Sequence, residues 1–103
     1  MGFVYLIGED EAINRFKIGV TKCNDINKRL KKLQTGNSNE LFIKHVYETD
    51  RPFKLETMLH NYYKHNNILN EWYELSPDDV KSFRSVCNKM QTIIDSLSDN
   101  PYF

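Results

Sequence analysis

The sequence is poor in cysteine, glycine and proline, and it carries no excess of charge of either sign. Its 103 residues include 2 cysteines, 4 glycines and 3 prolines. Cys23 and Cys87 form no CxxC motif, so neither a disulfide framework nor a zinc site is predicted. The 14 basic and 14 acidic residues give a formal net charge of zero, so the overall charge favours no class of partner.

Long hydrophobic runs are also missing. No apolar segment reaches the length of a membrane span, and no signal peptide precedes the first predicted strand, so we expect an intracellular, cytoplasmic protein with no membrane partner. The apolar content of 40% and the aromatic content of 13% are typical of a folded globule. Residues 1–103 are expected to form one domain, because the chain is long enough for a single modest core.

Basic residues are concentrated in one part of the chain. Between residues 15 and 32, Asp25 is the only acidic residue. The basic residues of this stretch are Arg15, Lys17, Lys22, Lys28, Arg29, Lys31 and Lys32. This segment is therefore a candidate surface for an anionic partner, although the whole chain is neutral.

Strand and helix patterns alternate along the sequence. Apolar and β-branched residues predict three strands, at 2–8, 15–21 and 41–48. Helical spacing predicts three helices, at 25–34, from Asp50 to about 65, and at about 77–97. The order β-β-α-β-α plus a C-terminal helix predicts an α+β fold with a small antiparallel or mixed sheet covered by helices.

Capping residues and apolar stripes define these helices more closely. The predicted N-caps are Asn24 and Asp50, with Ser76 and Asp79 at the start of the third helix and Gly36 just after the first. The predicted core face of the second helix is Leu55, Met58, Leu59 and Tyr62. In the third helix the predicted apolar stripe is Val80, Phe83, Val86, Met90, Ile93 and Leu97.

The segment "FKIGVT", residues 16–21, alternates apolar residues with Lys17, Gly19 and Thr21. This is the period of a half-buried strand. Glycine within a strand indicates a bulge or a close approach to the backbone. Lys17 beside it fits either a solvated surface position or a site that receives an anion.

Arg29 differs from the lysines of the same predicted helix. At about 100° per residue, Ile26, Leu30 and Leu33 share one face and Lys28, Lys31 and Lys32 share the opposite one. Arg29 falls on the border between these faces. There its fork of donors suits a phosphate, and its long side chain equally suits covering apolar surface.

A second candidate group lies in the predicted second helix. Glu56 and His60 are i, i+4 neighbours, a spacing that suits a metal site, an acid–base pair or a simple surface hydrogen bond. Tyr5 lies in the strand that pairs with the "KIG" stretch. Together with Lys17 and Arg29 these groups form a plausible set for phosphodiester hydrolysis, with a carboxylate for a metal, cations for the phosphate and a phenol as base for water.

Five segments in register resemble the GIY-YIG endonuclease superfamily, and more closely its short phage and large-DNA-virus branch with a KIG second motif. "GFVYLI" resembles the first motif and "FKIGVT" the second. "KRLKKLQTGN" resembles the arginine helix of that branch, "LETMLHNYYK" its glutamate helix, and "NEWYEL" its closing Glu-Trp-aromatic element. The likeness extends over residues 2–75, in the order in which the family has these motifs.

The resemblance implies a three-stranded antiparallel sheet flanked by helices, and hydrolysis of DNA with one divalent cation, Mg²⁺ or Mn²⁺, and no small-molecule cofactor. It implies that Glu56 holds the metal, that Arg29 stabilises the phosphate and that Tyr5 helps to deprotonate water. His60 matches a histidine common in this branch. The expected nucleic-acid contacts are Gly19, Lys22, Lys28, Lys31 and Lys32. We expect a monomer or weak dimer, in the host cytoplasm if the protein is viral or phage-encoded.

The clearest departure from the family pattern is Lys17, which replaces the tyrosine of the second motif. The base role then falls to Tyr5, with Lys17 assisting, and Asn70 is the candidate match for the asparagine that closes the family's active site. The alternative hypothesis is a catalytically inactive nucleic-acid-binding or host-interaction module on the same scaffold, which the zero net charge favours. A third interpretation is a structural protein with a basic helix face.

Overall fold

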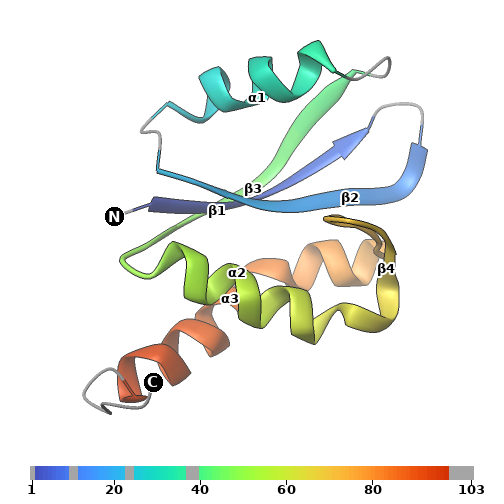
Figure 1. The fold of residues 1–103 in the computed structure, drawn as a ribbon. Helices are drawn as coiled ribbons and strands as arrows, with labels where there is room; N and C mark the ends of the chain where they lie inside the picture. The colour runs from blue at the N-terminus through green and yellow to red at the C-terminus, as the bar shows by residue number, and fades with distance from the viewer. Residues whose placement is uncertain (1, 10–11, 23–24, 37–39, 98–103) are drawn as a thin grey trace.

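The computed structural model describes residues 2–9, 12–22, 25–36 and 40–97, and it has the predicted α+β class (Figure 1). The elements in chain order are β1 (Gly2–Glu9), β2 (Ala12–Thr21), α1 (Ile26–Thr35), β3 (Leu41–Thr49), α2 (Pro52–Tyr62), a 3-10 helix η1 (Lys64–Asn66), β4 (Asn67–Leu69), β5 (Trp72–Glu74) and α3 (Pro77–Leu97). None of the helices described is long and apolar enough to cross a membrane.

The described sheet has five strands in the order β3-β1-β2-β5-β4, and neighbouring strands are antiparallel. The prediction of three strands was therefore wrong. The two additional strands, β4 and β5, are only three residues long each, which is too short to show a period-2 pattern in the sequence. They form a hairpin around Asn70, whose φ of 53° is a left-handed conformation that asparagine tolerates better than most residues.

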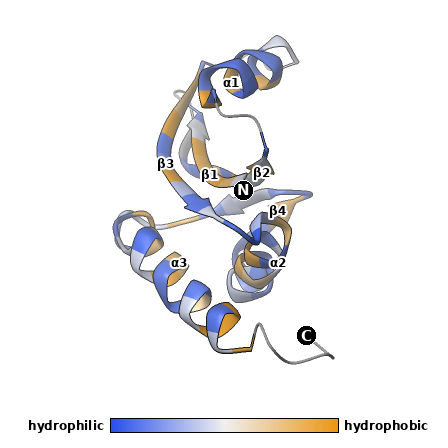
Figure 2. Ribbon diagram, turned by 90° about the vertical axis from the view of Figure 1, so that its left-hand side faces the viewer, coloured by the Kyte–Doolittle hydropathy of each residue, from blue (hydrophilic) through white to orange (hydrophobic). Residues whose placement is uncertain are grey.

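Helices cover both faces of the sheet. Figure 1 shows α1 on one face and α2 with α3 on the other. Successive side chains of β1 point to opposite faces, so Tyr5 and Ile7 pack under α1, while Val4 and Leu6 pack against α2 and α3. All four have 0% exposure. In Figure 2, α1 has its hydrophilic colour on the side away from the sheet.

The helix ends differ in part from the predicted caps. Asp25 is the N-cap of α1, and its carboxylate accepts a hydrogen bond from the Asn27 N–H at 3.0 Å; Asn24 lies outside the described residues. Arg51, rather than Asp50, is the N-cap of α2. Asp50 is turned toward α3, where its Oδ1 accepts a hydrogen bond from Gln91 at 3.3 Å.

The predicted capping box of α3 is confirmed. The Asp79 N–H donates to Ser76 Oγ at 3.1 Å, and the Ser76 N–H donates to Asp79 Oδ2 at 3.0 Å. These reciprocal bonds satisfy two backbone donors at the start of the helix. Gly36 is the C-cap of α1, as predicted.

The core faces of α2 and α3 are rotated slightly from the predicted ones. In α2, Tyr62 is 50% exposed and the following residue, Tyr63, is buried in its place. In α3, Ile93 and Leu97 are exposed, whereas Cys87 and Ile94 are buried. Val80, Phe83, Cys87 and Ile94 are separated by steps of three, four and seven residues, so they share one face of the helix.

The cysteine prediction can be followed at one position. Burial raises the pKa of the Cys87 thiol to about 12, so this residue stays protonated at neutral pH. Cys23 lies outside the described residues. Cys87 thus acts as a small apolar residue of the core.

Candidate functional site

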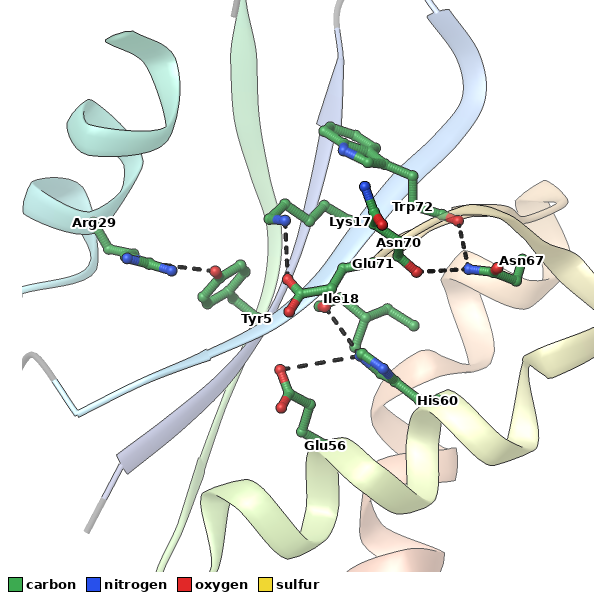
Figure 3. Close-up of polar contacts among 10 residues, drawn as sticks. All are labelled: Tyr5, Lys17, Ile18, Arg29, Glu56, His60, Asn67, Asn70, Glu71 and Trp72. Atoms are coloured by element: carbon green, nitrogen blue, oxygen red, sulfur yellow. Dashed lines mark hydrogen bonds and ion pairs between the residues drawn. The ribbon is translucent and has the colours of Figure 1, made fainter. Parts of the chain in front are cut away.

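The candidate site lies where β5 stops pairing with β2. The β5 ladder covers Arg15–Lys17 of β2, and one further bond runs from the Ile18 N–H to the Glu71 carbonyl at 3.1 Å. Side chains alternate along a strand, so this part of β2 presents groups to both faces of the sheet. Polar residues from the α1 side and from the α2 side come together there (Figure 3).

On the α1 side, Tyr5 lies directly across from Gly19 in the β1–β2 pair. A Cβ atom on Gly19 would overlap the ring and the hydroxyl of Tyr5. The tyrosine ring therefore lies over the bare backbone of Gly19, and its hydroxyl accepts a hydrogen bond from Arg29 Nε at 3.4 Å. This bond raises the pKa of Arg29. Arg29 is thus held at the edge of the sheet by the buried tyrosine.

The sequence indicated a close approach to the backbone at the glycine of "FKIGVT", and the group that approaches is the Tyr5 side chain. The sequence suggested open space for a ligand beside Lys17. Tyr5 fills the space over Gly19, and both residues are buried. The proposed contact of Gly19 with nucleic acid stays a prediction, but the structure gives this glycine a packing role.

Lys17 is held by a residue that sequence reasoning did not select. Its Nζ lies 2.9 Å from Glu71 Oε2, and the two side chains are 16% and 41% exposed. The Lys17 ammonium also lies 5.8 Å from the centroid of the Trp72 ring. In the sequence, Glu71 is marked only by its place in the "NEWYEL" element. The tight turn at Asn70 just before it is the signal that could have placed its carboxylate beside β2.

On the α2 side, Glu56 and His60 project toward the same edge of β2. Glu56 Oε2 lies 4.0 Å from His60 Nε2, and the same nitrogen lies 3.2 Å from the Ile18 carbonyl oxygen. Burial raises the pKa of Glu56, and the nearby carboxylate of Glu71 raises it further, while His60 and Lys17 lower it. The Glu56 side chain is 17% exposed, so it is largely removed from water.

The two sides of the site meet at Ile18 and Glu71. The backbone of Ile18 bonds Glu71 through its N–H and His60 through its carbonyl. In Figure 3 the Glu71 carboxylate lies between Lys17 and Glu56. The sheet thus brings together two cations, Lys17 and Arg29, with two carboxylates. Such a group can bind a phosphate diester and a divalent cation side by side.

The fit to a divalent cation depends mainly on Glu56. Within the part of the chain that is described, no three His, Cys, Asp or Glu side chains are arranged to hold a metal. A site with one or two carboxylates is nevertheless typical of Mg²⁺, which keeps several waters and binds substrate phosphate oxygens. Glu56, with Glu71 close enough to raise its pKa, fits that pattern.

The remaining basic residues are spread around this centre. Lys28, Lys31 and Lys32 are exposed on α1. They lie away from the apolar side of the helix, which packs on the sheet as predicted. Lys22 is exposed just after β2 and lies over the Phe53 ring, with its Nζ 5.4 Å from the ring centroid. Asn70 lies in the β4–β5 turn, and its carbonyl accepts a hydrogen bond from Asn67 Nδ2 at 2.8 Å.

Substitution of Gly19 by alanine tests the close approach of Tyr5. We expect Gly19→Ala to lower the free energy of unfolding by about 1–3 kcal/mol, because a buried ring and the β2 backbone must move apart. Gly36→Ala is the matched control, since no heavy atom lies within 4 Å of the added Cβ. Urea unfolding of both variants is the measurement. Equal effects would show that Tyr5 does not constrain position 19.

The raised pKa of Glu56 predicts a stability cost at neutral pH. The fold favours the protonated form of Glu56 over the carboxylate. The stability that protonated Glu56 gives the fold is present at low pH and is lost as the pH rises through the raised pKa. Glu56→Gln should therefore raise the Tm at about pH 8, and raise it less at about pH 5. About 1 kcal/mol corresponds to about 4–8 °C for a domain of this size. Exposed Glu48→Gln is the control, and a fall in Tm for Glu56→Gln at the higher pH would contradict the expectation.

Comparison with known families identifies one match. Residues 2–88 match the T5orf172 domain, a GIY-YIG-like domain of phage endonuclease type. Comparison with curated proteins found no match, and comparison with solved structures found none either. The matched segment runs from β1 into α3 and contains every residue of the candidate site. The chain therefore belongs to the T5orf172 domain family.

Proposed function

We propose that this protein is a divalent-metal-dependent DNA endonuclease that hydrolyses phosphodiester bonds, in the KIG branch of GIY-YIG-like nucleases. One observation carries the proposal. Lys17 and Arg29 from one face of the sheet and Glu56 from the other converge on one edge of β2, through the contacts of Ile18 and Glu71. Membership of a family of phage endonuclease type supports the same reaction.

Glu56 is the proposed metal ligand. Glu56 would hold Mg²⁺ or Mn²⁺, which would supply Lewis-acid stabilisation of negative charge during hydrolysis. His60 lies 4.0 Å from the Glu56 carboxylate and fixes its own ring through the Ile18 carbonyl. His60 therefore acts on Glu56 as a positioning residue, which keeps the carboxylate aimed at the sheet edge.

Arg29 and Lys17 are the proposed phosphate ligands. Water attacks phosphorus and gives up a proton, and a new P–O bond forms. The bond to the leaving sugar oxygen breaks, and that oxygen takes up a proton from solvent. The two cations neutralise charge on the remaining phosphate oxygens. Tyr5 orients Arg29 through its hydroxyl, and Glu71 orients Lys17. The use of Tyr5 as base for the water stays a prediction. In this conformation Tyr5 has 0% exposure, so water does not reach its side chain.

The rival function is a catalytically inactive module that binds nucleic acid or a host component. One observation favours it: Glu71 already neutralises Lys17 at 2.9 Å, so a phosphate must compete with a carboxylate for this cation. The same pair is compatible with catalysis if the incoming phosphate displaces Glu71. For the nuclease we propose a monomer or weak dimer in the cytoplasm, with DNA as the partner.

A plasmid-cleavage assay separates the two functions. Purified protein is incubated with supercoiled plasmid and with branched DNA, in Mg²⁺ or Mn²⁺ and in EDTA. We expect the wild type to cleave DNA in Mg²⁺ or Mn²⁺ and not in EDTA. Glu56→Ala should reduce the cleavage rate by about 10²-fold or more, because the proposed metal ligand is lost. If wild type and variant leave every substrate equally intact, the binding module replaces the nuclease. Equal cutting by both would place the activity outside this site.

Two lysine variants serve as matched arms of this assay. Lys17→Ala removes a cation of the site, and Lys31→Ala removes one from the exposed face of α1. Lys17→Ala should reduce cleavage much more than Lys31→Ala. Equal effects would reduce Lys17 to part of a general basic surface.

A further inference from the structure

A pocket lies at the start of α2, beyond the residues assigned to catalysis. Its volume is about 330 Å³. Its lining residues are Lys22, Asp50, Arg51, Pro52, Phe53 and Lys54. Phe53 is 56% exposed, and the Lys22 ammonium lies over its ring. The pocket therefore combines an accessible aromatic ring with several cations.

The charges of the pocket favour an anion. Three cations line it, and the one carboxylate, Asp50, accepts a hydrogen bond from Gln91 of α3. Arg51 and Lys54 also lie at the N-terminal end of α2, where the helix macrodipole disfavours positive charge. The macrodipole and all three cations would attract a polyanion in the pocket.

The pocket and the candidate active site lie on one continuous edge. At one end, His60 of α2 contacts the Ile18 carbonyl of β2 at 3.2 Å. At the other end, Lys22 just after β2 lies over the ring of Phe53 in α2, with 5.4 Å between its Nζ and the ring centroid. Glu56 lies between these two contacts along α2, one helical turn after Phe53, so the two side chains project from the same side of the helix.

We propose that this pocket binds one unpaired nucleotide of a DNA strand whose neighbouring phosphate lies in the active site. The base would stack on the Phe53 ring, and the attached phosphate would lie against Lys22 and Arg51. Aromatic stacking of this kind needs a base that is free of its duplex, and it tolerates any base because each has a flat π-face. The proposal rests on the proposed function in that DNA is the polyanion, and it adds a preference for DNA with a single-stranded segment.

Binding without metal tests the pocket independently of cleavage. The probe is a fluorescein-labelled 12-nucleotide single strand, compared with the blunt duplex that it forms with its complement, by fluorescence anisotropy in EDTA. We expect Phe53→Ala to weaken single-strand binding by about tenfold, the scale of one base–aromatic stack, and to change duplex binding by less than about twofold. Phe53→Trp should retain single-strand binding, because its ring also stacks.

Matched controls lie on the same helix and on another one. Tyr62→Ala removes an aromatic residue of similar exposure from the far end of α2, and Lys89→Ala removes an exposed cation from α3. Both should leave single-strand binding within about twofold of the wild type, whereas Lys22→Ala should weaken it several-fold. Circular dichroism melting checks that each variant is folded.

Each outcome has one meaning. Unchanged single-strand binding in Phe53→Ala, or an equal loss for single strand and duplex, overturns the stacking pocket. If the pocket passes this test but the wild type cuts no DNA in Mg²⁺ or Mn²⁺, the nuclease function fails and the nucleotide site stands. If cleavage is observed but Phe53→Ala binds normally, the nuclease stands and the nucleotide site fails.

Discussion

The contact between the Tyr5 ring and the bare backbone of Gly19 is the constraint on which the site depends. A side chain at position 19 would overlap the Tyr5 ring, and in this position the Tyr5 hydroxyl accepts a hydrogen bond from Arg29. The same contact is buried, so the position of Arg29 is fixed by the core of the sheet instead of by a flexible surface side chain. The packing contact between Tyr5 and Gly19 therefore also positions Arg29, which is a proposed phosphate ligand.

The edge of β2 also explains why the site carries balanced charge. Lys17 is close to Glu71, and Glu56 is placed near both Glu71 and His60. Lys17 has a nearby carboxylate before any ligand arrives, which limits the cost of removing this charge from water. The ionised form of Glu56 is disfavoured, because burial and Glu71 both raise its pKa. Such a cost at a half-buried carboxylate is typical of a functional site, where binding of a cation would relieve it.

Local patterns in the sequence predicted the helices and their faces, because these features depend on residues close together in the chain. The 3.6-residue period of residues 77–97 and the division of α1 into apolar and basic faces needed no knowledge of the rest of the fold. The border position of Arg29 followed from the same period. Long-range contacts could not be predicted in this way. The strands β4 and β5 exist because a three-residue segment pairs with β2 more than fifty residues earlier, and the pairing of Glu71 with Lys17 follows from that registry.

The proposed function requires Glu56 and the edge of β2 to bind a divalent cation beside the DNA. Paramagnetic broadening of backbone amide NMR signals by small amounts of Mn²⁺ locates such a cation. The signals of Gly19, Glu56 and His60 are expected to lose intensity first, and Glu56→Gln is expected to abolish this effect. Broadening centred on another part of the chain, or broadening that persists unchanged in Glu56→Gln, would contradict it.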